Sequence, residues 1–160
     1  MTIGDQINQL RRRVEEFASC MESLPSGWFL KPIDAWAPRD VVAHLIGWNR
    51  YTITGCEQIR KGETPFYFFD PGEDFSKINA TLVQAYASRD KQEILGELTA
   101  SLQELTQYLH SLDPADWERD TGVTYQGEVI TIRSTVDALM GDFVNHQRQI
   151  EAWAGNLDST

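Results

Sequence analysis

The chain has few of the features that mark secreted, membrane-spanning or disulfide-stabilised proteins. Its 160 residues include two cysteines, Cys20 and Cys56, each inside a predicted helix and neither in a Cys-x-x-Cys motif. We therefore expect free thiols in a reducing compartment. No long apolar run and no apolar segment after a basic start is present, which argues against a membrane span or an export signal. These absences predict a cytoplasmic protein.

Positive charge is also scarce. The chain has 14 Lys and Arg against 24 Asp and Glu, a formal net charge of −10 at pH 7. Nucleic-acid binding requires clustered Lys and Arg to neutralise phosphates. The one basic run, residues 11–13, is followed by Glu15 and Glu16 and is typical of a solvated helix face. We expect a small molecule as the partner, and neither nucleic acid nor a membrane.

Apolar residues recur three and four positions apart in four long segments, as in amphipathic helices. Pro38 and Asp40 mark the start of the second segment, and Ser88 is a candidate N-cap for the third. Gly155 is a stop signal for the last. The four predicted helices cover residues 3–24, 39–61, 89–112 and 132–154.

A segment rich in aromatic residues joins the second and third predicted helices. Residues 62–75 contain Pro65 and Pro71 and cannot form one helix. When extended they could span roughly 45 Å, enough to cross a bundle. We therefore predict an all-α four-helix bundle with a long aromatic crossover packed over it. The remaining predicted parts are a short helical stretch at 77–87, a small hairpin at 123–130, and a single domain over 1–155 with a tail at 156–160.

Two histidines and an aspartate form the candidate site. Asp142 and His146 are four residues apart, so their side chains project from one face of a helix. His44 flanks the apolar stripe of the second helix and could reach them from a facing helix. Two imidazoles and a carboxylate are typical of catalytic divalent-metal sites such as zinc. A hydrogen-bonded His–Asp pair in the core would fit the same spacing, and the residues alone leave both interpretations open.

Residues next to His44 supply a candidate substrate pocket. Trp48, Asn49 and Arg50 offer an aromatic wall, a polar group and a cation. His110 lies in the last turn of the third helix, where a cation favours the helix dipole, so we assign it no ligand role. None of the five tyrosines is placed in the site, because half-buried tyrosines more often pack than act as acids.

Two stretches resemble the DinB/YfiT-like superfamily. They are 36–49, WAPRDVVAHLIGWN, and 141–150, GDFVNHQRQI. Within that superfamily the chain is most similar to the ClbS/DfsB group, which shares the aromatic connector and the Asn79-Ala80 pair. The resemblance covers nearly the whole chain and implies an up-down-down-up bundle. Homodimers are common among similar proteins, so it also implies a homodimer.

The resemblance also implies a ligand set. Many members hold zinc or nickel with one histidine on the second helix and a His-x-x-x-His pair on the fourth. His44 matches the first and His146 the last, while Asp142 stands in place of the middle histidine. Mycothiol-dependent maleylpyruvate isomerase, in the same superfamily, is similar in pairing an acidic residue with the histidine four positions later.

Three functions follow from these observations. The first is a divalent-metal-dependent enzyme that transfers a thiol to a small electrophile or hydrolyses it. Any thiol would come from a cosubstrate such as bacillithiol, mycothiol or glutathione, because neither cysteine is placed near the three candidate ligands. The second is a metal-free protective protein that binds or hydrolyses a reactive metabolite, as the ClbS-like members imply. The third is a non-catalytic bundle with a structural His/Asp network.

Overall fold

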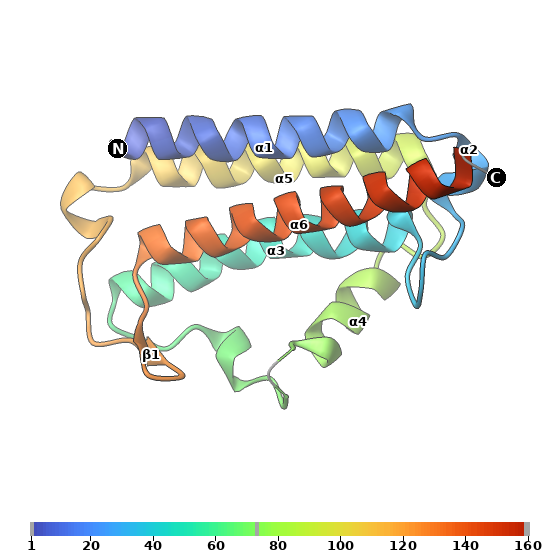
Figure 1. Cartoon of the computed structure of the whole chain (residues 1–160). Coiled ribbons are helices and arrows are strands. Elements are labelled where there is room, and N and C mark those ends of the chain that lie inside the picture. Colours follow the sequence, from blue (N-terminus) through green and yellow to red (C-terminus); the bar gives the residue numbers. More distant parts are fainter. Residues whose placement is uncertain (1, 73, 159–160) are drawn as a thin grey trace.

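The computed structural model describes residues 2–72 and 74–158, so the predictions for residues 1, 73, 159 and 160 lie outside the described residues. It consists of four long helices with short elements between them (Figure 1). No helix in the described ranges is long and apolar enough to cross a membrane. The long helices are α1 (Ile3–Ser23), α3 (Pro38–Arg60), α5 (Lys91–Ser111) and α6 (Ile132–Asp158). The short elements are α2 (Ser26–Phe29), η1 (Phe66–Phe69), α4 (Ser76–Gln84), η2 (Pro114–Asp116), β1 (Thr124–Tyr125) and β2 (Glu128–Val129).

The long helices form the predicted all-α bundle. Figure 1 shows α1 and α6 running in one direction and α3 and α5 in the other. Helix α1 packs against α5 and α6, and α3 packs against the same two helices. Each long helix contributes side chains with no exposed surface, because its apolar stripe faces the shared core. Leu10, Leu45, Leu105 and Phe143 are one such set.

The capping residues explain where two of the helices begin. At α3, Pro38 occupies the first turn and the Asp40 carboxylate accepts a hydrogen bond from the Ala37 amide, as the sequence predicts. At α5 the N-cap is Asp90, whose carboxylate accepts from the Glu93 amide at 2.9 Å. The predicted cap, Ser88, is wrong: the helix begins two residues later, where a side-chain oxygen reaches the third amide.

The last helix runs further than predicted. A glycine ends a helix when it adopts a left-handed backbone, and Gly155 is not among the residues with positive φ. Helix α6 therefore continues to Asp158, so 156–158 of the predicted tail belong to the helix. The predicted hairpin is present as β1 and β2, which pair antiparallel. Both of its turn residues, Gln126 and Gly127, have positive φ, as a type I′ turn requires.

The crossover packs over α3 through its aromatic side chains. Tyr67 is 5% exposed, and its ring centroid lies 5.1 Å from that of Trp48. Phe68 stacks on Tyr125 of the hairpin at 4.0 Å, which ties the crossover to the start of α6. Phe69 is 75% exposed, and Phe66 is 37% exposed although its ring contacts Tyr51 edge to face. The prediction of a packed aromatic crossover is confirmed for the rings other than Phe69.

Two glycines of α3 let the covering segments approach this helix closely. A Cβ atom at Gly47 would collide with the Leu82 side chain of α4. A Cβ atom at Gly55 would lie 2.7 Å from Cε2 of Tyr67. The crossover and α4 therefore dock where α3 has no side chain.

We expect Gly55→Ala to lower the free energy of unfolding by roughly 1–3 kcal/mol, because the buried Tyr67 ring must be displaced. Gly96→Ala is the matched control: Gly96 lies on an exposed face of α5 with nothing within 4 Å. That variant should gain up to about 1 kcal/mol of helix stability. Urea unfolding of both variants measures the effect, and equal stabilities would contradict close docking of Tyr67.

Candidate functional site

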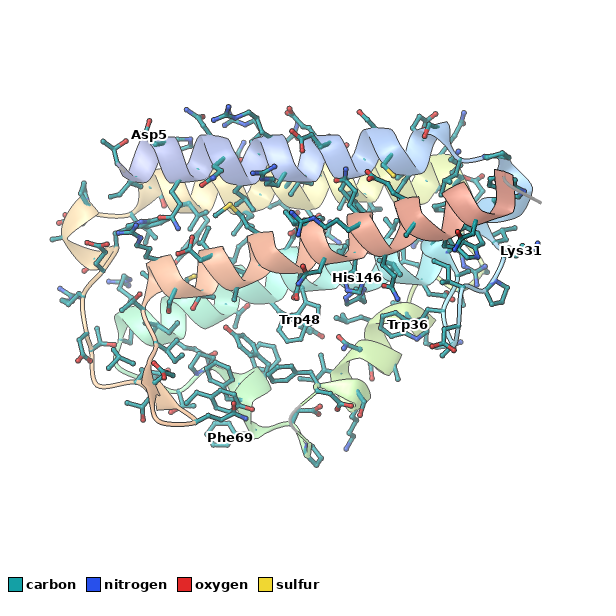
Figure 2. All side chains as sticks on the ribbon, viewed as in Figure 1. Asp5, Lys31, Trp36, Trp48, Phe69 and His146 are labelled. Carbon is teal, nitrogen blue, oxygen red and sulfur yellow. The ribbon has the colours of Figure 1, made fainter. Side chains whose placement is uncertain are left out.

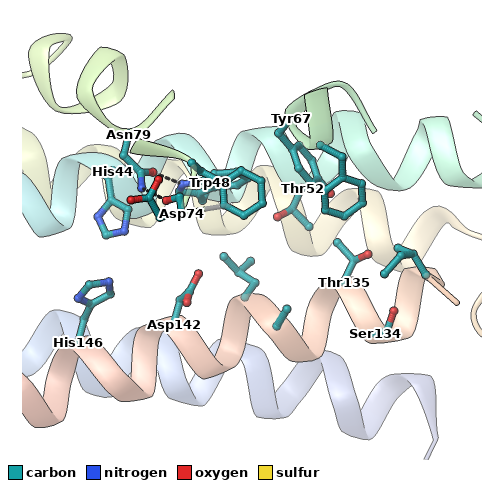
Figure 3. A pocket seen from close by; sticks show the side chains of 15 residues that line it. His44, Trp48, Thr52, Tyr67, Asp74, Asn79, Ser134, Thr135, Asp142 and His146 are labelled. Carbon is teal, nitrogen blue, oxygen red and sulfur yellow. Dashed lines mark hydrogen bonds between the residues drawn. The ribbon is translucent and has the colours of Figure 1, made fainter. Parts of the chain in front are cut away.

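A cavity of about 390 Å³ lies between α3 and α6 and is covered by the crossover and the start of α4 (Figure 3). His44, Trp48 and Thr52 line it from α3, four residues apart and therefore on one helix face. Asp142 and His146 line it from the facing side of α6. The all-side-chain view in Figure 2 places His146 and Trp48 within the same region of the bundle. The three predicted ligands thus share one cavity.

The two histidines face each other across this cavity. Their ring centroids are 4.8 Å apart, with the rings nearly perpendicular. His44 Nδ1 lies 2.6 Å from the Val41 carbonyl oxygen. Because a carbonyl can only accept, Nδ1 carries the proton, and Nε2 of the neutral ring has a lone pair. Trp36 packs against the same imidazole, with ring centroids 4.9 Å apart.

Burial controls the charge of these groups. Burial, and to a lesser extent the nearby His146, lowers the pKa of His44 to about 3, so His44 is neutral at pH 7. Burial also lowers the pKa of His146, against the opposing effect of Asp142. Burial raises the pKa of the Asp142 carboxyl, which His146 partly offsets. The site therefore contains two imidazoles in the neutral form that binds metals.

The donor types fit a divalent metal. His146 Nδ1 is buried and has no hydrogen-bond partner among the described residues, which leaves a polar atom for a ligand to satisfy. Within the same residues, however, no group of three His, Cys, Asp or Glu side chains is placed closely enough to hold an ion. Metal binding would require His44, Asp142 and His146 to draw closer together, and the shared ion stays a prediction.

Asn49 and Arg50, which the sequence predicts in the pocket, lie elsewhere. Asn49 is fully buried, and its amide nitrogen donates to the Ser101 hydroxyl of α5 at 3.0 Å. Arg50 forms ion pairs with Glu97 at 3.0 Å and Glu104 at 2.8 Å. Successive side chains of an α-helix are rotated by about 100° around its axis. The two residues after Trp48 therefore point away from the cavity, and both contact α5. The prediction is corrected: of the three, only Trp48 lines the cavity.

The structure adds cavity residues that the sequence analysis did not place there. Asp74 and Phe75 come from the crossover, and Asn79 from α4 accepts a hydrogen bond from Trp48 Nε1 at 2.7 Å. Tyr67 also lines the cavity, although no tyrosine was expected there, and burial raises the pKa of its hydroxyl. Thr135 lies seven residues before Asp142, and this helical spacing could have identified it.

The remaining histidine and both cysteines lie outside the cavity. His110 is exposed in the last turn of α5, away from the cavity. Cys20 and Cys56 are free, with Cys56 buried and Cys20 partly buried, and neither lines the cavity.

Solved structures with the same fold include proteins of three kinds. DfsB, a sibling lethal factor precursor, has a TM-score of 0.80 at 11% identity over 98% of this chain and 97% of its own. The colibactin self-resistance protein ClbS, in complex with a dsDNA, has a TM-score of 0.74 at 14% identity over 96% and 95%. The mycothiol-dependent maleylpyruvate isomerase has a TM-score of 0.75 at 12% identity, and the match covers 93% of this chain but 60% of that protein.

These identities show a shared fold and not a shared activity. The dsDNA complex is a finding about ClbS; for this chain, the absence of nucleic-acid binding stays a prediction from its charge. No curated protein matches the chain significantly in sequence. The sequence profile of the DinB superfamily matches residues 6–150, which include all of α3 and α5, most of α1 and α6, and all three predicted ligands. The chain therefore belongs to the DinB superfamily.

Proposed function

We propose that this protein is an enzyme that holds a divalent metal, zinc or nickel, with His44, Asp142 and His146. Its substrate is a small electrophilic molecule that undergoes thiol transfer or hydrolysis. One observation carries the proposal. The neutral imidazoles of His44 and His146 come from facing helices with ring centroids 4.8 Å apart, and the Asp142 carboxylate lines the same cavity. A divalent metal supplies Lewis acidity, which makes water or a thiol nucleophilic at neutral pH.

The chain's own groups would orient and shield this chemistry. The hydrogen bond between His44 Nδ1 and the Val41 carbonyl fixes the tautomer and the ring orientation. Trp36 covers one side of the His44 ring. Trp48 is fixed by its bond to Asn79 and forms an apolar wall that limits access of water.

A thiol for group transfer would come from a cosubstrate. Cys56 is fully buried, and burial raises the pKa of its thiol to about 12, so it is not a nucleophile at neutral pH. Cys20 lies outside the cavity. The mycothiol dependence of the structurally similar isomerase supports a low-molecular-weight thiol such as mycothiol, bacillithiol or glutathione.

A second candidate function is a metal-free protein that binds or hydrolyses a reactive metabolite. The absence of a tight three-ligand group among the described residues favours it. In that case Asp142 would act as the general base, with His146 one turn away on the same helix face as its partner. The self-resistance role in the name of ClbS supports protection against a reactive compound.

Elemental analysis of untagged protein, purified without added metal, separates these functions. The proposal predicts about one zinc or nickel ion per chain, with the same content in His110→Ala, which changes a histidine outside the cavity. Protein that contains no metal and takes up none on dialysis against zinc contradicts the proposal and favours the metal-free candidate.

A further inference from the structure

The cavity extends beyond the two histidines, and none of the described residues that line it carries a permanent positive charge. In Figure 3 it runs along α3 and α6 from His44 and His146 toward Thr52 and Thr135. Among the described residues that line it there are two carboxylates and neither a lysine nor an arginine. Arg50, although next to Trp48 in the sequence, is held on the other side of α3 by its two glutamate partners.

Hydrogen-bond donors in the cavity are either already used or uncharged. Trp48 Nε1 donates to Asn79, and Thr135 Oγ1 donates to the Thr131 carbonyl at 2.8 Å. The Thr135 hydroxyl therefore offers a ligand only its acceptor capacity. Asp74 Oδ1 accepts from the Ser76 amide, and its second carboxylate oxygen has no hydrogen bond to the described residues. The described lining residues thus offer charged acceptors and no charged donor.

The covering side of the cavity is aromatic. Trp48 contacts Tyr67 and Phe75 edge to face, with ring centroids 5.1 and 5.5 Å apart. These contacts, and the stacking of Phe68 on Tyr125, hold the rings in place. Fixed aromatic rings bind flat apolar groups, and their faces attract cations.

We propose that the organic molecule bound in this cavity is a flat, apolar amine, with its body on the aromatic wall and its ammonium group donating to Asp74. Without the metal, anionic molecules are disfavoured because the described lining residues present two carboxylates and no cation. This inference rests on the proposed function in that the same cavity is the substrate site, but it does not require the metal.

Three probes with one ring system test the charge preference: 2-naphthylmethylamine, 2-naphthylmethanol and 2-naphthoate. Their binding is measured by calorimetry at pH 7 with EDTA present, so that bound metal does not contribute. We expect the amine to bind at least about tenfold more tightly than the carboxylate, with the alcohol between them. Equal affinities, or tighter binding of the carboxylate, overturn the proposal.

Two matched variants test the place of the ammonium group. Asp74→Asn should weaken amine binding by roughly threefold and leave alcohol binding unchanged, as expected for a partly exposed ion pair. Glu63→Gln removes the same charge from an exposed position of the crossover and should change neither. Equal effects of the two variants contradict a contact at Asp74. Because every measurement is made in EDTA, absence of metal from the purified protein and failure of the charge preference are separate results.

Discussion

His146→Ala is expected to lower the affinity for zinc between about a hundred- and a thousandfold. Structural zinc sites contribute roughly 10–16 kcal/mol with four ligands, so one ligand accounts for about 2.5–4 kcal/mol. His146 faces His44 across the cavity, and its Nδ1 has no other partner in the described part of the chain. Zinc affinity is measured by competition with a chromogenic chelator at pH 7.

The same measurement on other variants locates the ion. Asp142→Ala should lose most of its affinity as well, whereas Asp142→His should retain zinc because it restores an imidazole at the middle position. His110→Ala should bind zinc like the parent protein, because His110 lies outside the cavity. If both His146→Ala and Asp142→Ala keep full zinc occupancy, the ion is not held at this site.

The second large effect is a loss of stability in acid caused by His44. Its folded-state pKa is depressed to about 3 by burial and by His146, whereas an unfolded histidine titrates near 6.5. Between these values the unfolded chain binds one more proton than the folded chain, so acidification favours unfolding. His44 should therefore lower the free energy of unfolding by roughly 1.4 kcal/mol for each pH unit below about 6.5, ending near pH 3.

Urea unfolding at several pH values between 7 and 4.5, in EDTA, measures this contribution. Relative to the parent, His44→Gln should lose stability less steeply as the pH falls, because glutamine has no proton to bind. His110→Gln replaces an exposed histidine and should follow the parent. Parallel curves for the parent protein and His44→Gln would show that His44 is not buried in its neutral form.

The sequence was sufficient for features that depend on local periodicity. The apolar stripes of the long helices are visible because every third or fourth residue must be buried, and the four-residue spacing of Asp142 and His146 fixes them on one face. The length of the crossover was sufficient to predict a helix order other than consecutive hairpins. These predictions needed no knowledge of which side chains meet.

Features that depend on tertiary packing were beyond the sequence. Asn49 and Arg50 follow Trp48 directly, and only the position of α5 shows that they face away from the cavity. Asp74 and Tyr67 belong to a crossover without periodicity, so their place over the cavity depends on the glycines of α3 that allow close docking. Asp90, a second strong N-cap residue, lies two positions after Ser88, and α5 begins there.

Crystals of the zinc-loaded protein, with data collected at the zinc absorption edge, test the central claim most directly. We expect one anomalous peak in the cavity between α3 and α6, about 2.0–2.2 Å from a nitrogen of His44, a nitrogen of His146 and a carboxylate oxygen of Asp142. A peak at other residues, or no peak in protein that retains a full equivalent of zinc in solution, would contradict it.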